Sequence, residues 1–278
     1  MTNEFVALYV VPTPLGNLSD ITRRAEEVLR AVPWVAAEDT RHSAPLLKHL
    51  GANARLLPAH EHNEREAAAR IIERLQAGES VALVSDAGTP AVSDPGTRIV
   101  AQVREAGFPV VPLPGPCAAV TALSAAGLPE PHFLFYGFLP TKAAQRRHAL
   151  EELQPLPYAL VFYEAPHRVL ETVDDLAAVF GDRTLVVAKE LTKLFETIHS
   201  CPLSEAADWF KADPNRQKGE FVLLVSGNAD EGDAGESDRV LKILLAEGLP
   251  VKQVAKLAAA ITGAHKNALY DRALELKG

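Results

Sequence analysis

Short runs of β-branched and aliphatic residues alternate along this chain with segments whose apolar residues recur at helical spacing. In the segment 63–76, for example, Ala67, Ile71 and Leu75 lie on one face of a helix. Strands that alternate with helices are typical of the α/β class. The pattern therefore predicts an α/β fold, with strands at Phe5–Val11, Val81–Ser85, Val110–Leu113, Phe133–Phe138, Ala159–Tyr163, Leu185–Lys189 and Glu220–Ser226.

A chain of 278 residues is long for one hydrophobic core, so two α/β domains are expected. Glycine- and proline-rich loops concentrate in the first part, and new strands begin after Gly127-Leu128-Pro129. The stretch 228–238 (NADEGDAGESD) is polar and acidic, which is typical of a flexible linker. We expect an N-terminal α/β domain over 1–115, a second over 116–228, a linker over 229–238 and a helical domain over 239–278.

The last forty residues contain helical patterns only. Leu241 and Leu245, Val254 and Leu257, and Leu269 and Ala273 lie on the apolar faces of three short helices. Three such helices fit a small helix-turn-helix-like domain. A helical lid packed on the main body fits the pattern equally well.

Caps and glycines mark the expected helix ends. Asp94-Pro95 has a capping residue before a proline, which predicts a helix start there. Gly78, Gly107 and Gly127 each follow a helical pattern, where a left-handed residue can end the helix.

Composition narrows the class of protein. The net charge of −8 weighs against a protein that coats long nucleic acid, although a local basic face is compatible with it. Two cysteines without a CxxC pair imply neither a disulfide framework nor a zinc site. With no HExxH motif, signal peptide or long apolar run, we expect no bound metal, no membrane span and a cytoplasmic enzyme.

Two glycine-containing loops follow predicted strands. The first, PTPLGNLSD (12–20), is by itself most simply a strand-to-helix turn. The second, SDAGTP (85–90), lies where open α/β sheets bind ligands. Asp86 could accept hydrogen bonds from ribose hydroxyls or an amino group, and this role is favoured over simple capping. Asp94, further along, is expected only to cap.

The third loop is PLPGPCA (112–118), again between a strand and a helix. Its prolines stiffen the turn, Gly115 leaves space, and Cys117 and Ala118 are small enough for a flat adenine or a thioether to approach. Cys117 is interpreted as a wall of such a site rather than as a nucleophile.

Charged and aromatic residues gather at two later strand ends, FYEAPHR (162–168) and AKELTK (188–193). These residues could bind or activate a substrate. Ion pairs with a purely structural role would give the same pattern.

Together these segments resemble one family. The matching stretches are VPTPLGNLSDIT (11–22), AAEDTRH (36–42), HEHNE (60–64), VALVSDAGTPAVSDPG (81–96), PLPGPCA (112–118), FYGFLP (135–140), FYEAPHR (162–168), AKELTK (188–193) and GEF (219–221). They resemble, in the same order, the bacterial 16S ribosomal RNA cytidine 2′-O-methyltransferases of the tetrapyrrole methylase superfamily.

The resemblance implies two α/β domains with S-adenosylmethionine in the cleft between them, a homodimer, and a small C-terminal helical domain. It implies as acceptor the ribose 2′-hydroxyl of a cytidine in the decoding region of 16S rRNA, within the small ribosomal subunit. The residues that it places at the cofactor, together with Gly115 of the third loop, are Leu15, Gly16, Asp86, Gly88, Thr89, Gly115, Cys117, Ala118, Phe162 and Tyr163.

Methyl transfer from a sulfonium depends mainly on alignment, with help from a base or a cation at the hydroxyl. Glu190 and Lys193 are the catalytic candidates, and a structural salt bridge between them is the alternative. Two rival functions are a methyltransferase acting on a tetrapyrrole and a non-catalytic ribosome-binding module. The candidates for a basic RNA-binding surface are Arg23, Arg24, Arg41, Lys142, Arg146 and Arg147.

Overall fold

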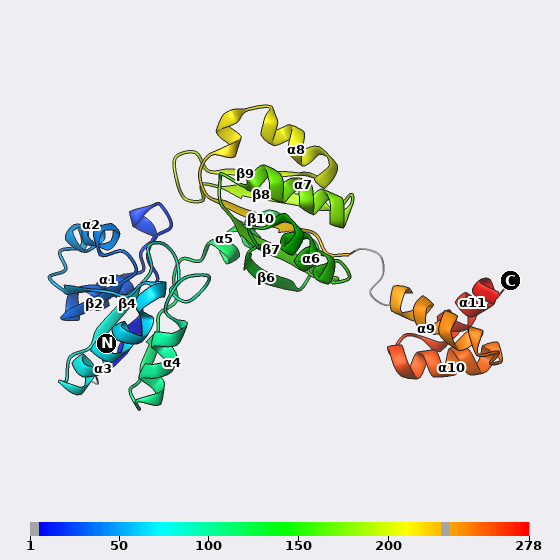
Figure 1. Ribbon diagram of the computed structural model, residues 1–278, viewed down its shortest axis with the longest axis horizontal. Helices are drawn as coiled ribbons and strands as arrows, with labels where there is room; N and C mark the ends of the chain where they lie inside the picture. Colours follow the sequence, from blue (N-terminus) through cyan, green and yellow to red (C-terminus); the bar gives the residue numbers. More distant parts are fainter. Residues whose placement is uncertain (1–5, 229–233, 278) are drawn as a thin grey trace.

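The computed structural model describes residues 6–228 and 234–277. Figure 1 shows two α/β units, each built on a sheet, followed by a helical bundle near the C-terminus. Each sheet contains five strands. The α/β class predicted from the alternating pattern is confirmed.

The first sheet is entirely parallel, in the order β3-β2-β4-β1-β5. Parallel strands are buried on both faces, and helices cover both faces here. One face packs against α1 and α2 and the other against α3 and α4. The elements are β1 (Leu8–Val10), α1 (Arg23–Ala31), β2 (Trp34–Ala37), α2 (Thr40–Leu50), β3 (Arg55–Pro58), α3 (Glu64–Gln76), β4 (Val81–Val84), α4 (Thr97–Glu105) and β5 (Val110–Pro112).

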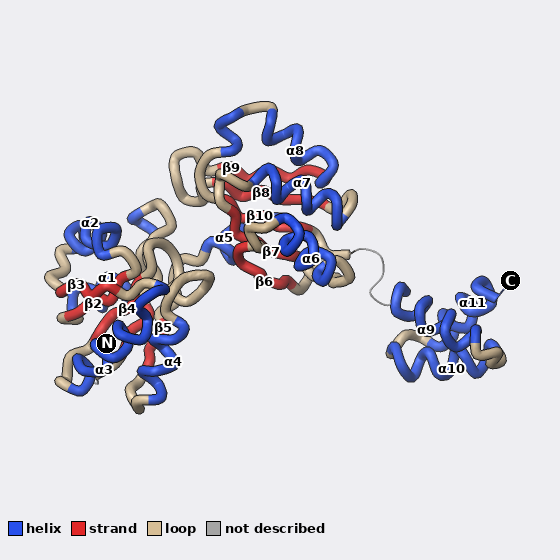
Figure 2. The backbone as a smooth tube through the Cα atoms, in the orientation of Figure 1, coloured by secondary structure: helices blue, strands red, loops and turns tan. Residues whose placement is uncertain are grey.

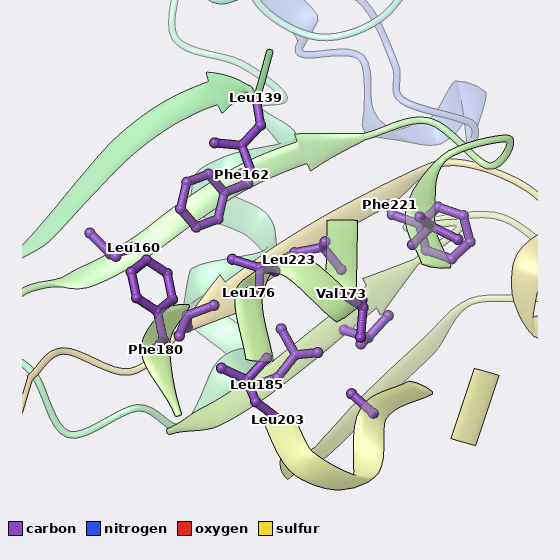
Figure 3. Packing of buried hydrophobic residues seen from close by; sticks show 14 of the residues in the cluster. Leu139, Leu160, Phe162, Val173, Leu176, Phe180, Leu185, Leu203, Phe221 and Leu223 are labelled. Atoms are coloured by element: carbon purple, nitrogen blue, oxygen red, sulfur yellow. The ribbon is translucent and has the colours of Figure 1, made fainter. Parts of the chain in front are cut away.

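The second sheet is mixed, in the order β6-β7-β10-β8-β9, with β6 parallel to β7 and the other pairs antiparallel. Its main core lies under α6, α7 and α8, and Figure 3 shows Phe162, Leu176 and Leu223 within it. The other face packs against α5. The elements are α5 (Ala118–Ala126), β6 (Phe133–Phe138), α6 (Ala143–Leu153), β7 (Ala159–Glu164), α7 (Val169–Phe180), β8 (Thr184–Lys189), β9 (Thr197–Pro202), α8 (Leu203–Lys211) and β10 (Phe221–Val225).

All seven predicted segments contain a strand, but β2, β3 and β9 were missed. β3 ends in a proline and β9 is largely polar, and both lie at sheet edges, where the apolar signal is weak. Gly78, Gly107 and Gly127 have φ of +82°, +83° and +66°, which confirms them as left-handed positions after helices.

The predicted cap at Asp94 is wrong. Helix α4 begins at Thr97 with Gly96 at its N-cap. The Gly96 N–H, buried, donates to Glu64 Oε1 at 2.6 Å, so a glutamate of α3 supplies the acceptor that the third residue of the helix supplies in a capping box. Asp94 is therefore not used as a helix cap and is available to the loop that contains it.

The C-terminal helices α9 (Ala234–Ala246), α10 (Val251–Thr262) and α11 (Lys266–Lys277) enclose an apolar core of their own. Leu241, Val254, Ala258, Leu269 and Ala273 are buried in it. Helix α9 already covers residues 234–238, which had been predicted as linker, and the rest of the linker, 229–233, lies outside the described residues. Among the described helices none is long and apolar enough to cross a bilayer.

Candidate functional site

A cavity of about 280 Å³ lies where the loops of the two α/β domains meet. Figure 2 shows these loops, in tan, crowded between the first sheet and α5. Strand ends from both sheets contribute walls, as the sequence predicted for loops that follow strands. The cavity is lined by Leu15, Ala87, Gly88, Thr89, Val92, Asp94, Cys117, Ala118, Phe138, Tyr163, Glu164, Ala165, Pro166, Ala188, Leu191, Glu220, Phe221 and Val222.

Hydrogen bonds join the three glycine-containing loops into one wall. Thr13 and Gly88 exchange two backbone hydrogen bonds, with N···O distances of 2.8 and 3.0 Å. Gly88 has φ of +83°, a conformation that favours glycine, and a Cβ there would lie 3.3 Å from Leu15 Cδ2. The Thr89 hydroxyl donates to the Pro116 carbonyl at 2.8 Å, which links the second loop to the third.

The packing of the third loop requires a residue without a side chain at position 115. A Cβ at Gly115 would lie 2.6 Å from Pro12 Cβ, so glycine allows the third loop to pack directly on the first. After this turn, Cys117 is the N-cap of α5 and Ala118 begins the helix. Both small residues face the cavity, as predicted.

Alternation along β7 separates the two aromatic residues predicted at the cofactor. Tyr163 lines the cavity, and its hydroxyl oxygen accepts a hydrogen bond from the Ala119 N–H at 3.1 Å. Phe162 is fully buried in the core on the opposite face of the sheet (Figure 3). Successive residues of a strand point to opposite faces, so the ring of Phe162 is turned away from the cavity.

Phe138 is a wall that the sequence did not reveal. It lies at the end of β6, is 52% exposed, and its ring centroid is 5.7 Å from that of Tyr163. Phe135 also contacts Tyr163, with centroids 4.9 Å apart. In a regular strand Phe135 and Phe138 would point to opposite faces of the sheet. Both contact Tyr163 because the register of β6 shifts between Phe135 and Gly137. Such a bulge cannot be predicted from a regular alternation of residues.

Two glycines set the distance between the domains at the rim. A Cβ at Gly16, in the first domain, would lie 2.3 Å from Cγ of Lys193, in the second. A Cβ at Gly137, in the second domain, would lie 2.6 Å from Oγ of Ser93, in the first. At each of these glycines, a side chain of the other domain fills the space that a Cβ would occupy.

The candidates Glu190 and Lys193 form an ion pair beside this rim. Lys193 Nζ lies 3.0 Å from Glu190 Oε1 and 2.8 Å from Glu220 Oε2. Burial opposes ionisation of Glu190, but the Glu220 amide and Lys193 outweigh it and hold the pKa of Glu190 below its usual value. Of these three residues, Glu220 lines the cavity.

Three carboxyl groups converge beside the cavity: Glu38 follows β2, and Asp86 and Asp94 belong to the loop after β4. Burial, followed by the charge of Asp86, raises the pKa of Glu38. Burial, followed by the charge of Glu38, raises the pKa of Asp94 to about 6. Asp86 Oδ1 accepts a hydrogen bond from the Asp39 N–H at 3.1 Å, and of the cluster it is Asp94 that lines the cavity.

The structure therefore divides the predicted site residues into four groups. Gly16, Asp86 and Gly115 shape the loops behind or beside the walls, Phe162 belongs to the core, and Glu190 and Lys193 form the rim ion pair. The predicted residues that line the cavity together are Leu15, Gly88, Thr89, Cys117, Ala118 and Tyr163. Asp94, which was expected only to cap a helix, lines the cavity instead.

Residues 7–207 match the family model described as Tetrapyrrole (Corrin/Porphyrin) Methylases, well over half of the chain. The chain belongs to the tetrapyrrole methylase family. Within the family it is 55% identical to ribosomal RNA small subunit methyltransferase I of Escherichia coli O157:H7, over 98% of this chain and 96% of that protein. The protein of the same name from Pseudomonas aeruginosa is 56% identical, over 98% of both chains.

A second family model, the RsmI C-terminal HTH domain, matches residues 231–277. This match accords with the three-helix unit and favours the helix-turn-helix interpretation over the lid.

Solved structures show the same tetrapyrrole methylase fold at low identity. The methyltransferase CobJ aligns with a TM-score of 0.61 at 20% identity, over 81% of this chain and 95% of that one. A uroporphyrin-III C-methyltransferase from Thermus thermophilus, solved with S-adenyl homocysteine, has a TM-score of 0.56 at 18% identity, over 78% of this chain and 96% of that one.

Proposed function

We propose that this protein transfers a methyl group from S-adenosylmethionine to the RNA of the small ribosomal subunit. One observation carries the proposal. Over 98% of its length, the chain is 55–56% identical to proteins named ribosomal RNA small subunit methyltransferase I. The domain that follows the two α/β domains also matches its counterpart in that group.

The residues of the cavity suit this cofactor. The volume of the cavity, about 280 Å³, is near the lower end of the range for small-molecule pockets, about 300–1,000 Å³. Leu15, Val92 and Leu191 offer apolar walls to the cofactor. When bound, S-adenosylmethionine supplies a methyl group already activated by the sulfonium charge.

Of the residues predicted to bind the cofactor, we assign direct contacts to those that line the cavity and indirect roles to the rest. Gly16, Gly115 and Asp86 hold the loops in place, and the ring of Phe162 supports β7 from behind. The direct contacts are Leu15, Gly88, Thr89, Cys117, Ala118 and Tyr163.

The roles of Glu190 and Lys193 were left open between catalysis and a salt bridge. Lys193 has two carboxylate partners, and its aliphatic stem covers Gly16. A lysine held in this way contributes more to the closure of the cleft than to an alkoxide. The geometry therefore favours a structural ion pair.

The finer assignment is the 2′-hydroxyl of a cytidine in the decoding region of 16S rRNA. Its support is the motif resemblance, together with an exposed aromatic side chain, Phe138, at the cavity. Aromatic rings stack on nucleobases, which can be drawn out of folded RNA. We further propose that the protein works in the cytoplasm.

RNA contacts are assigned to a reduced set of basic residues. Arg146 is only 1% exposed and pairs with Asp175 at 2.6 Å, so its proposed role in a basic surface is wrong. Arg147 is paired with the same carboxylate. Arg23, Arg24 and Lys142 are exposed and stay candidates, with the C-terminal helices as a second contact region. Arg41 is exposed too but, like Arg147, is paired with a carboxylate, that of Asp39 at 2.7 Å.

We also propose a homodimer. Leu194 and Phe195 are 89% and 70% exposed, next to the cleft-closing Lys193. Adjacent large apolar side chains exposed to this degree favour burial against a partner. Sedimentation of the purified chain distinguishes a dimer from a monomer.

The function is tested by offering labelled S-adenosylmethionine with unmodified small subunits, naked 16S RNA and tetrapyrroles in parallel. Transfer to subunits, at a ribose that then resists alkaline hydrolysis, is expected. Transfer to the base alone would disprove the 2′-O assignment. Transfer to a tetrapyrrole without any to RNA would leave only the fold.

A further inference from the structure

Three carboxylates line the cavity, and two of them are already neutralised. Glu164 is buried and accepts hydrogen bonds from Arg168, from the Thr172 hydroxyl at 2.6 Å and from the Ala165 N–H at 2.7 Å. Glu220 is paired with Lys193. Within residues 6–228, Asp94 is the cavity carboxylate that has no ion pair with a lysine or arginine.

The backbone around Asp94 is held in an unusual conformation. Ala91 and Ser93 have φ of +67° and +62°, a region that side-chain-bearing residues seldom adopt. The surrounding contacts that hold the loop are the buried bond from the Gly96 N–H to Glu64 and the fit of Ser93 against Gly137. Strain that persists in a loop lining a cavity is typical of a functional position.

We propose that the Asp94 carboxylate accepts the proton of the acceptor hydroxyl during methyl transfer. The inference rests on the proposed function, since it needs a ribose hydroxyl as acceptor. In the step, the ribose oxygen forms a bond to the methyl carbon, the carbon–sulfur bond of the donor breaks, and the hydroxyl proton passes to Asp94. The positive charge of the sulfonium and the negative charge of Asp94 are consumed together, so the step creates no net charge.

The groups that face Asp94 tune it for this role. Glu38 at the end of β2 and Asp86 after β4 repel a negative charge on it, whereas the Ser85 hydroxyl stabilises that charge. Tyr163, from β7, also lines the cavity and lies close enough to interact electrostatically with Asp94. A base works best when its pKa lies near the working pH, and the carboxylate cluster moves Asp94 toward that range.

The main test replaces Asp94 by asparagine, which keeps the shape and removes the proton acceptor. Loss of a general base typically lowers the rate about 10²- to 10⁴-fold, and we expect a fall in kcat of that size on small subunits. Calorimetry should show unchanged affinity for S-adenosylmethionine. Asp94→Glu should recover part of kcat, and Asp208→Asn, an exposed carboxylate on α8, should behave as wild type.

The pH profile separates a proton acceptor from a structural residue. Wild-type kcat/KM, which reports the pKa values of the free protein, should fall below a pH of about 6 as Asp94 becomes protonated. Glu38→Gln removes a neighbouring charge and should move this fall to lower pH. The Glu38→Gln profile decides the question even where Asp94→Asn does not fold.

Four results would overturn the proposal: unchanged kcat in Asp94→Asn, the same acid limb in that variant, a loss of cofactor affinity that accounts for the lost activity, or no movement of the limb in Glu38→Gln. If wild type methylates subunits and Asp94→Asn has the same kcat, only the role of Asp94 as proton acceptor is disproved. Should wild type methylate tetrapyrroles and no RNA, the proposed function fails and the ribose proton transfer falls with it.

Discussion

The Ser93 hydroxyl occupies the space that a side chain on Gly137 would need, since a Cβ there would lie 2.6 Å from Ser93 Oγ. Ser93 belongs to the loop that also contains Asp94, and Gly137 belongs to the bulge that turns Phe138 toward Tyr163. One close approach thus fixes two walls of the cavity with respect to each other. The fit between the domains is therefore a determinant of the site.

Gly137→Ala should weaken S-adenosylmethionine binding because the loop of residues 85–96 has to move. Overpacking of a tight contact typically costs about 1–3 kcal/mol, which corresponds to about 5- to 150-fold in affinity if it is expressed at the site. Calorimetry on the purified chain measures the change. The double variant Ser93→Gly/Gly137→Ala should recover most of the affinity, because it removes the clashing hydroxyl.

Gly107→Ala is the matched control for this prediction. Gly107 has the same φ of +83° as Gly137, but no atom lies within 4 Å of its added Cβ. It should lower stability through backbone strain and leave cofactor affinity unchanged. Equal losses of affinity in the two variants would mean that strain, and not the contact with Ser93, is responsible.

Phe138→Ala should impair the use of small subunits more than cofactor binding. Its exposed ring stands at the cavity, where it can stack on a nucleobase. Such stacking is worth about 1–3 kcal/mol per base, so kcat/KM should fall about 5- to 150-fold. Phe133→Ala, which removes an equally exposed ring (47%) at the other end of β6, should have little effect.

Arg146→Ala should destabilise the second domain. Its guanidinium is buried against Asp175, which is 3% exposed, and removal of one partner of a buried pair costs about 3 kcal/mol or more. Arg147 bonds the same carboxylate from the surface, where solvent screens the pair, so Arg147→Ala should cost far less. Urea denaturation measures both, and similar losses would contradict the distinction made here.

The fragment 1–228 should fold and bind S-adenosylmethionine, because α9, α10 and α11 have a separate apolar core. Its activity on small subunits should fall, and the full chain should lose activity more steeply as salt rises, since phosphate contacts release counterions. Circular dichroism, calorimetry and methyl transfer test the three parts. An unfolded fragment would show that the helical domain is a lid after all.

Most of the fold could be read from local pattern. Buried strands such as Val81–Val84 have continuous apolar runs, and the glycine loops follow them, so the cavity was found at the correct strand ends. The edge strands β3 and β9 were missed because half-exposed strands have little apolar signal. Helix caps supplied from elsewhere, such as Glu64 at Gly96, are not visible in the neighbouring sequence.

The site was harder to predict than the fold because its residues meet only in three dimensions. Nothing near Arg146 in sequence shows that Asp175 will bury it, and nothing near Lys193 shows that it will cover Gly16. Likewise, Asp94 has an unusual environment because Glu38 arrives from another strand, β2, and the loop folds Asp86 back toward it. Sequence motifs identified the loops, whereas charge coupling and burial required the packed structure.

Asp94→Asn should stabilise the protein at neutral pH. The pKa of Asp94 is about 6 in the folded protein and near the ordinary value of 3.8 when unfolded, so folding favours its protonated form. Between these values the folded state binds more protons, and wild-type stability must fall as pH rises through this window. Above pH 6 the ionised carboxylate lowers the free energy of unfolding by its full amount. Below pH 4 the carboxyl group is protonated in both states and has no effect.

The difference in Tm between Asp94→Asn and wild type should therefore be largest at pH 7 to 8 and shrink as pH falls from about 6 toward 4. Asp208→Asn, at an exposed position, should show no such trend. The melts need neither RNA nor cofactor, so they test the environment of Asp94 independently of activity. A difference that is constant from pH 4 to 8 would mean that Asp94 titrates as an ordinary surface carboxylate, and the carboxylate cluster would then have no influence on it.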